Sequence, residues 1–406
     1  MYSVGRLVKG SLIGGKVRNA TLLCTILAVG SGTLGACGSS SGSAKASGSP
    51  IKIGAIFSST GPISDLAEMN IDGLKLAEQQ INQSGGIDGH PVQLFIEDDQ
   101  TKPDQAVVLA NQLLQQDGVS AVIGATTGNS TLAIEPVFEA AGVPLVAPVG
   151  TAQVTQPPRN ETFRAMIADT VYNEATVNLL KQKFAGKRVA ILHDNSAASI
   201  GYVAGLTKLF SSNGINLVGN EQFGSSDTDI TPVLTVLRSK NPDVIIDQGY
   251  SSSAFIALKN AKQLGMNNVA FIGAAGMPRQ QTITVGGTAT EGLIVPTPVI
   301  ENSPRAYQKT FFDEYNKAYP NRSINPYPTL WDVITYDAMN LIKQAVINEH
   351  GKFTPQAIHD GLQAIKNFQG VTGVYSYGPG QRDGITSPNS LGWAQVQNGQ
   401  FVAYKA

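Results

Sequence analysis

The chain has 406 residues, which is enough for two domains that each bury a core. Its formal net charge is −1 at pH 7, from 29 basic and 30 acidic residues, with no long run of either sign. With 42% hydrophobic and 15% charged residues, the composition is that of a globular protein and excludes the basic footprint of a nucleic-acid binder.

The N-terminal segment predicts export rather than a folded element. Residues 1–18 carry four basic residues and no acidic one, and residues 20–29 form an apolar core too short to span a bilayer. The following Leu34-Gly-Ala-Cys37 resembles the lipobox of bacterial lipoproteins, in which cleavage precedes a cysteine that carries lipid. We therefore expect residues 1–36 to be a signal peptide and Cys37 to anchor the chain on the outer side of a membrane.

The alternative is an ordinary signal peptide that is cleaved after Ala36 without lipidation. Either cleavage removes Cys24 and leaves Cys37 as the only cysteine, so an acylated chain has no thiol left for a disulfide. Residues 37–49 are mostly Gly, Ser and Ala, and this composition predicts a flexible linker.

The first half of the remaining chain alternates predicted strands and helices. It opens with the apolar run Ile51–Phe57, which is typical of a buried parallel strand. A helix follows and ends at Gly85-Gly86. Strands are predicted at residues 51–57, 92–96, 119–123 and 144–147, and helices at 71–81, 106–114 and 130–138.

The same order recurs in the second half, over residues 188–276. Two further helices, at 305–319 and 329–349, follow it, and hairpin-like strands are predicted from 373–377 to 401–404. A repeated α/β module predicts two lobes, each with its own parallel sheet, that face each other across a binding cleft. The repeated strands are predicted at residues 188–193, 215–219, 244–246 and 269–272, and the helices at 204–211, 230–237 and 253–264.

The sequence lacks the motifs of common catalytic and metal sites. Its G-x-G-x-x-G run, Gly30–Gly35, lies in the predicted signal peptide outside any strand–helix context and is a chance match. The acidic run Glu97-Asp-Asp99 favours a solvated loop over an acid pair, because no second acidic cluster supports it. The four histidines have no metal-ligand spacing. We therefore expect no enzyme, no cofactor and no metal.

One loop has the composition of an anion-binding site. Thr126–Thr131 joins a predicted strand to a helix, and Gly128 within it lets the backbone approach a ligand closely. The first amides of a helix lack intrahelical partners and carry partial positive charge, which suits a carboxylate. An ordinary N-cap is the alternative. Binding is favoured because ligands of open α/β sheets lie beyond the carboxyl ends of strands, where Val149–Ala152 also falls.

A series of short motifs runs along the chain: Thr60-Gly-Pro62, Ile81-Asn82 with Gly85–Gly89, Asp99, Val122-Ile-Gly124, Phe163-Arg164 with Asp169, Tyr336-Asp-Ala338 and Gly373-Val-Tyr375. In this order they resemble the type I solute-binding proteins of ABC importers, in particular the branched-chain amino acid (Leu/Ile/Val) group, over about residues 50–406. The resemblance implies two Rossmann-like α/β lobes with parallel sheets, joined by three hinge strands. Lobe 1 is then expected at 50–168 with 298–385, and lobe 2 at 169–297 with 386–406.

The resemblance also implies which residues bind the ligand. The family binds an amino-acid carboxylate at the positions of Thr127–Asn129 and of Gly150-Thr151, where Thr151 matches a hydroxyl donor. Gly128 stands where many members have Ser, so that only its backbone amide is expected to act. In the second lobe, Tyr250 matches an aromatic residue that lines the pocket. The implied ligand-binding residues are Thr127, Gly128, Asn129, Gly150, Thr151, Tyr250 and Ala275.

Ala275 stands where the family commonly has an acidic residue that holds the ligand's ammonium group. Two aromatic positions of the family fall near Leu66 and Ile200, which are also apolar. A buried ammonium without a carboxylate partner is strongly disfavoured. The sequence therefore favours a ligand with a carboxylate or amide end and a less polar body, unless Asp194 or Asp247 supplies the missing charge.

These observations together predict an extracytoplasmic lipoprotein. It would capture a small solute, an amino acid or a related compound, and deliver it to the membrane permease subunits of an ABC importer. The alternative is a ligand sensor of the same fold that partners a membrane signalling protein. A secreted enzyme would need a nucleophile–base pair or a metal cluster, and neither is visible in the sequence.

Overall fold

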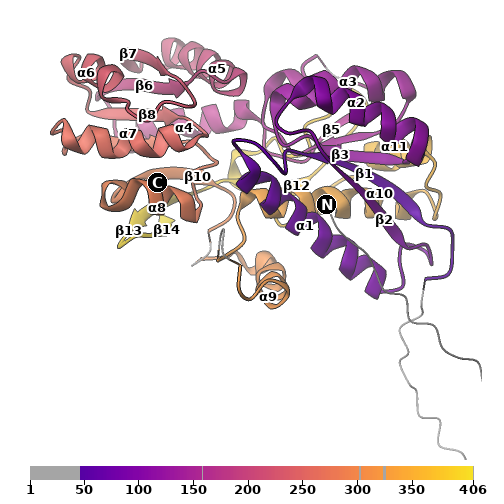
Figure 1. Ribbon diagram of the computed structural model, residues 1–406. Coiled ribbons are helices and arrows are strands. Elements are labelled where there is room, and N and C mark those ends of the chain that lie inside the picture. The colour runs from indigo at the N-terminus through magenta and orange to yellow at the C-terminus, as the bar shows by residue number, and fades with distance from the viewer. Residues whose placement is uncertain (1–45, 158, 301–302, 323–325, 406) are drawn as a thin grey trace, which may run out of the picture. The chain divides into compact units, whose positions relative to one another are not determined.

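The computed structural model describes residues 46–157, 159–300, 303–322 and 326–405 (Figure 1). The predicted signal peptide and Cys37 lie outside these residues. Within the described part of the chain, no helix is both long enough and apolar enough to cross a membrane.

The first sheet has five parallel strands in the order β2-β1-β3-β4-β5. Successive side chains of a strand point to opposite faces, so Ile53 packs with α1 and α10 while Ile56 packs with α2 and α3. Helices therefore cover both faces, as a parallel sheet requires (Figure 1). The strands are β1 (Ile51–Phe57), β2 (Val92–Asp98), β3 (Ala121–Gly124), β4 (Leu145–Ala147) and β5 (Thr162–Arg164), and the helices are α1 (Ser64–Gln83), α2 (Pro103–Gln112), α3 (Gly128–Ala141), α10 (Leu330–Asn348) and α11 (Pro355–Gln363).

The second sheet has seven strands in the order β14-β13-β10-β9-β8-β6-β7. β10, β9, β8, β6 and β7 are parallel, and β13 and β14 continue the sheet in antiparallel fashion. Ile246 of β8 faces α4 and α5, whereas Ile245 faces α6 and α7. The elements are β6 (Arg188–Asp194), β7 (Asn216–Phe223), β8 (Val244–Gln248), β9 (Ala270–Gly273), β10 (Ile294–Thr297), β13 (Gly392–Gln397), β14 (Gln400–Tyr404), α4 (Asp169–Lys183), α5 (Ala197–Asn213), α6 (Thr231–Ser239), α7 (Ser252–Gln263) and α8 (Gln280–Gly286).

Three segments connect the two sheets, which agrees with the expected three hinge strands. The first, Ala165–Ala168, leads from β5 into α4. The second leads from β10 through α9 (Lys309–Ala318) to α10, and the third leads from β12 (Val374–Tyr375) to β13. The expected α/β class with two parallel sheets is therefore confirmed.

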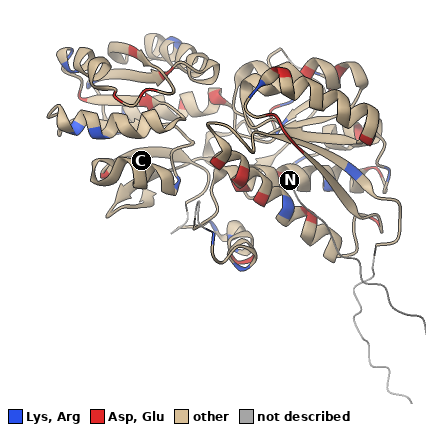
Figure 2. Ribbon diagram, in the orientation of Figure 1, with Lys and Arg blue, Asp and Glu red and all other residues tan. Residues whose placement is uncertain are grey.

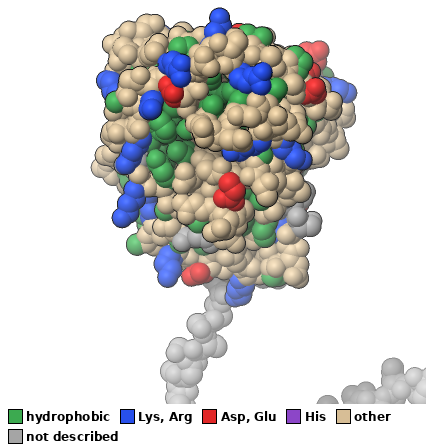
Figure 3. All heavy atoms as spheres, turned by 90° about the vertical axis from the view of Figure 1, so that its left-hand side faces the viewer, with side chains coloured by type: hydrophobic (Ala, Val, Ile, Leu, Met, Phe, Trp, Pro, Cys, Tyr) green, Lys and Arg blue, Asp and Glu red, His purple; other side chains and the backbone are tan. Residues whose placement is uncertain are grey.

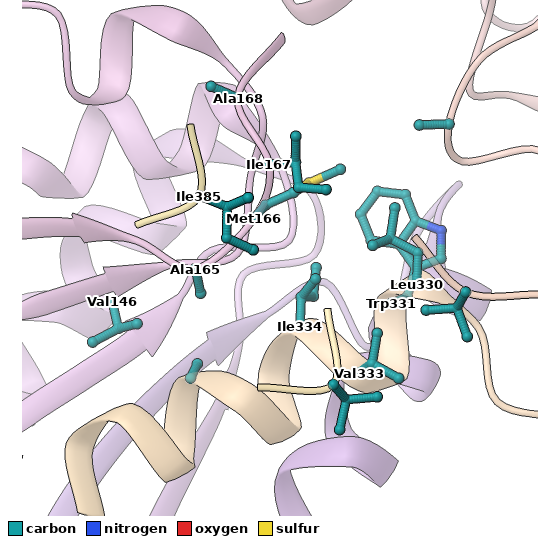
Figure 4. Packing of buried hydrophobic residues seen from close by; sticks show 14 of the residues in the cluster. Val146, Ala165, Met166, Ile167, Ala168, Leu330, Trp331, Val333, Ile334 and Ile385 are labelled. Atoms are coloured by element: carbon teal, nitrogen blue, oxygen red, sulfur yellow. The ribbon is translucent and has the colours of Figure 1, made fainter. Parts of the chain in front are cut away.

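The first and third connections are bonded to each other. The hydroxyl of Tyr375 donates to the carbonyl of Ala165, and that of Tyr377 donates to the carbonyl of Arg164, both at 2.7 Å. Figure 4 shows Ala165–Ala168 next to Ile385 of the third connection. The backbone at the crossing is therefore fixed by side chains that come from a distant part of the sequence.

The C-terminal third differs from the sequence expectation. β12 pairs with β11 (Phe368–Gln369), whereas the terminal strands β13 and β14 form a hairpin of their own. Helix α4 was not among the elements predicted from the sequence. Its buried positions include polar side chains such as Asn173 and Thr176, which obscure the apolar period of the helix.

The second sheet's outer helices present a mixed surface. Figure 3 views the side of the molecule on which α6, α7 and α8 lie, and shows an apolar area bordered by Lys and Arg side chains. α6 contributes an exposed apolar residue, Val236, whose relative exposure is 44%. This unit therefore presents basic and apolar groups to solvent side by side.

Candidate functional site

The start of α3 offers free backbone donors, as the sequence predicted for its loop. Thr127 is the N-cap residue, and its hydroxyl accepts a hydrogen bond from the amide of Ser130 at 3.1 Å. Gly128 and Asn129 are the first two residues of the helix, so their amides have no acceptor within it. The loop can therefore be an N-cap and a binding site at the same time. The cap takes up only the amide of Ser130, and the amides of Gly128 and Asn129 stay free for a ligand.

Gly128 and Thr151 lie against each other. A Cβ atom placed on Gly128 would lie 2.1 Å from the Thr151 hydroxyl oxygen, so only glycine permits this contact. The Thr151 side chain is buried beside the start of α3. The structure thus brings together the two first-lobe segments that the sequence singled out, and the Thr151 hydroxyl occupies the space that a side chain at 128 would fill.

Asp169 is a site residue that the sequence analysis did not select. A Cβ atom on Gly150 would lie only 2.4 Å from the Asp169 carboxylate oxygen, and the Asp169 amide donates to the Gly150 carbonyl at 3.0 Å. Burial raises the pKa of Asp169 to about 6, although the Arg164 guanidinium acts to lower it. A nearly buried carboxylate therefore lies directly beside the Gly150-Thr151 segment.

Arg164 holds that segment in place. Its fully buried guanidinium donates to the carbonyls of Val149 and Thr151 at 2.6 and 2.9 Å, and to the Thr155 hydroxyl at 2.6 Å. Its Nε is 2.7 Å from a carboxylate oxygen of Asp383. Because one planar group binds two carbonyls of the segment, the direction of the intervening Gly150 is fixed.

Three tyrosines of the second unit have raised pKa values. Burial raises the pKa of Tyr172, Tyr202 and Tyr250, and the charge of Asp169 raises each of them further. The Tyr202 hydroxyl lies 3.3 Å from the Thr176 hydroxyl of α4, the helix that begins at Asp169. Tyr250, expected from the sequence, is thus exposed to the same charge of Asp169 as the other two phenols.

The segment that contains Ala275 contacts two aromatic residues. A Cβ atom on Gly276 would lie 3.0 Å from both the Trp331 ring and the Tyr250 ring. Ala275 itself is buried, and Trp331 stands at the start of α10, where Figure 4 shows it beside Leu330. The indole nitrogen of Trp331 is buried and has no acceptor among the described residues. This side of the site is therefore aromatic and apolar.

The two acids considered as substitutes for the missing charge do not serve this purpose. The Asp194 carboxylate accepts hydrogen bonds from the Ser196 hydroxyl at 2.5 Å and from the Tyr250 amide at 3.0 Å, so it holds the Tyr250 loop. Asp247 is fully buried on the strand face that packs against α6 and α7, and burial raises its pKa strongly. Of the three carboxylates, that of Asp169 is the one that lies against Gly150.

Ile200, which the sequence put near an aromatic position of the site, is 47% exposed on α5. Tyr202 on the same helix is buried, and its hydroxyl lies 3.3 Å from the Thr176 hydroxyl of α4. A helix places residues two apart on different faces, so the aromatic side chain on the buried face of α5 is Tyr202.

Two α/β units with loops converging from both sides define a substrate-binding protein. Residues 50–399 match the sequence profile of the periplasmic binding protein family, and the chain belongs to that family. This is a family of binding proteins, not of enzymes, and it works on the extracytoplasmic side of the membrane.

The known relatives include amino-acid-binding proteins. A leucine-, isoleucine-, valine-, threonine- and alanine-binding protein of Pseudomonas aeruginosa is 27% identical over 327 residues, which cover 80% of this chain and 84% of that protein. The crystal structure of a leucine-binding protein of Thermotoga maritima is 26% identical with a TM-score of 0.79, over 87% of this chain and 98% of that one. A branched-chain amino acid transporter substrate-binding protein of Streptococcus pneumoniae, solved with isoleucine, is 25% identical with a TM-score of 0.78, over the same shares.

Proposed function

We propose that this protein captures an aliphatic α-amino acid between its two α/β units and delivers it to the permease of an ABC importer. The ligand carboxylate would bind the amides of Gly128 and Asn129 and the Thr151 hydroxyl. Its ammonium group would face Asp169. The observation that carries the proposal is the position of the Asp169 carboxylate directly beside Gly150, next to Thr151.

Asp169 meets the physical objection that Ala275 raises. A buried ammonium needs a carboxylate partner, and Ala275 cannot be one. In an α-amino acid a single carbon joins the ammonium to the carboxylate, so the two groups need neighbouring partners. Asp169 and Thr151 lie next to Gly150 and Gly128 respectively, which supports an α-amino acid over a ligand with a carboxylate alone.

The rest of the site supports an apolar ligand side chain. Ala275, Leu66 and Trp331 are buried in the same apolar cluster, and the rings of Tyr250 and Trp331 both lie against Gly276. No group in this set carries a charge that a polar ligand side chain would require. The names of the relatives from Pseudomonas aeruginosa and Thermotoga maritima, which bind leucine, favour the same class of ligand.

The test is to identify and then titrate the ligand. Mass spectrometry of the solute released from freshly purified, denatured protein should show an aliphatic amino acid. Leucine at 100 times its Kd should stabilise the protein by about 2.7 kcal/mol in thermal unfolding. Isocaproate, which lacks the amino group, and isoamylamine, which lacks the carboxylate, should both fail to do so. Isocaproate binding as tightly as leucine would contradict the role given to Asp169.

A substitution in the first unit tests the carboxylate half of the site. Thr151→Ala should weaken leucine binding about 10- to 100-fold, because a hydrogen bond to a charged group contributes about 1.5–3 kcal/mol. Isothermal titration calorimetry measures this change, and Thr151→Ser, which keeps the hydroxyl, is the matched control. Unchanged affinity in Thr151→Ala would remove this residue from the site.

We also propose that Cys37 carries the lipid anchor and that residues 37–49 form the tether. The proposal is supported by the Leu34-Gly-Ala-Cys37 motif after a basic and apolar leader. The wild-type chain should partition with the membrane fraction, whereas Cys37→Ser should not incorporate labelled palmitate. Equal labelling of both chains would contradict lipidation at this residue.

The lobe boundaries proposed from the sequence follow the strands of each sheet. Lobe 1 comprises 50–168 with 298–385, and lobe 2 comprises 169–297 with 386–406. The placement of β13 and β14 in the second sheet supports assigning the C-terminus to lobe 2.

A further inference from the structure

An ion pair joins the two α/β units beside the candidate site. Arg279 precedes α8 in the second unit, and its Nη1 lies 3.0 Å from a carboxylate oxygen of Asp65. Asp65 stands in the first turn of α1, against the first sheet. Among the ion pairs formed by the described residues, this is the one that joins α1 to the segment before α8.

Apart from Asp65, the groups that hold the guanidinium belong to the second unit. Its Nη2 donates to the carbonyl of Tyr250 at 2.8 Å, and its central carbon lies 5.1 Å from the centre of the Phe255 ring. The Arg279 side chain is only 4% exposed, and its Nε is buried without an acceptor among the described residues. The second unit therefore presents a nearly buried, pre-oriented cation toward α1.

We propose that Arg279 is a positioning residue that latches the two units together through Asp65 and thereby slows release of the ligand. The proposal rests on the proposed function, because the latch acts on the same site. Arg279 orients Tyr250 through its backbone, so the contact with Asp65 connects a site residue of the second unit to the first. Figure 2 marks acidic residues along the ribbon of α1.

The charges around the pair explain why it acts as a latch. Burial lowers the pKa of Arg279, and the charge of Asp65 counteracts that effect. Separating the units would remove the carboxylate partner of Arg279 and leave its hydrogen bond to the Tyr250 carbonyl. Asp65 is 22% exposed and can be hydrated when it is released. The attraction therefore exists only while the units are together, which is the state that retains a ligand.

Leucine release measures the latch directly. In the full-length protein, Asp65→Asn should raise the dissociation rate of leucine about tenfold and change the association rate much less, as expected when one partner of a buried pair is lost. Arg279→Lys keeps the charge but not the planar fork, so it should show an intermediate rate. Arg188→Gln removes an exposed ion pair with Asp243 within the second unit and is the matched control, expected to leave release unchanged.

A distance measurement separates the latch from the choice of ligand. Spin labels at Val108→Cys on α2 and Val236→Cys on α6, both exposed, report the separation of the units when Cys24 and Cys37 are replaced by Ser. In the absence of any ligand, Asp65→Asn should shift the distance distribution toward larger values at an unchanged melting temperature.

Two results would overturn the latch. One is that Asp65→Asn changes neither the distance distribution nor the leucine release rate. The other is that Asp65→Asn lowers the melting temperature enough to explain both the faster release and the larger distances. If leucine does not bind the wild-type protein but the distances shift as described, the latch stands and the proposed ligand is wrong.

Discussion

Asp169→Asn is expected to weaken leucine binding about 100- to 4,000-fold. Removing one partner of a buried charge pair costs about 3–5 kcal/mol, because the other charge is left without compensation. Asparagine keeps the shape of the side chain beside Gly150, so the loop geometry should be preserved. Isothermal titration calorimetry with leucine measures the loss.

The same substitution should not weaken the fold. Burial raises the pKa of Asp169 from 3.8 to about 6, which means that the folded protein disfavours the ionised form. At pH 7.5 the charge therefore opposes folding, and the ligand-free Asp169→Asn protein should be as stable as the wild type or more stable in urea unfolding. A loss of affinity that comes with an equal loss of stability would contradict a binding role.

The affinity of the wild type should also fall on acidification. Protonation of Asp169 removes the partner of the ammonium, so a group with a pKa of about 6 should reduce leucine affinity about tenfold between pH 7.5 and pH 5. The folding stability should depend on pH in the opposite direction to the leucine affinity. A raised carboxyl pKa means tighter proton binding in the folded state, so this group favours folding increasingly as the pH falls through 6. The affinity of Asp169→Asn should be flat over this range, and a flat wild-type profile would refute the assignment.

Arg164→Leu is expected to destabilise the protein by about 3–5 kcal/mol. The substitution removes the cation that faces the Asp383 carboxylate and the guanidinium hydrogen bonds to the carbonyls of Val149 and Thr151. The midpoint of urea unfolding measures the effect. If Arg164→Leu does not fold, Arg164→Lys is the second variant. It retains the charge with fewer donors and should lose only part of the stability.

The control for this prediction is an arginine of similar chemistry in a different environment. Arg188→Ala removes an exposed ion pair with Asp243, and it should change the unfolding free energy by less than about 1 kcal/mol. Arg164→Lys should also weaken leucine binding, because the Gly150-Thr151 segment loses part of its support. An effect of Arg164→Leu no larger than that of Arg188→Ala would show that the buried network does not stabilise the loop.

Local sequence patterns predicted much of the fold and the loop at the start of α3. The apolar run of β1 and the Gly-containing loop before α3 are short-range signals, and both appear where they were expected. Asp169 was missed because its importance comes from contact with Gly150 on a different element. The contact between Asp65 and Arg279 is likewise long-range, and no local sequence pattern in either segment predicts it. At Ala275 the sequence indicated that an acid is missing, but the replacement that we propose on α4, Asp169, could not be inferred from a local pattern.

The bonding of the crossing segments has a consequence for how such a protein can diversify. Arg164 stands at the first crossing, where Tyr377 binds its carbonyl, and its guanidinium supports the segment proposed to hold the carboxylate. The Gly150-Thr151 segment, which we propose binds the carboxylate present in every amino acid, is thus held by residues of the hinge. Substitutions that alter this segment are therefore expected to impair folding. Ala275 and Tyr250 lie outside that network, so new ligand side chains can be accommodated there by substitutions that leave the hinge intact.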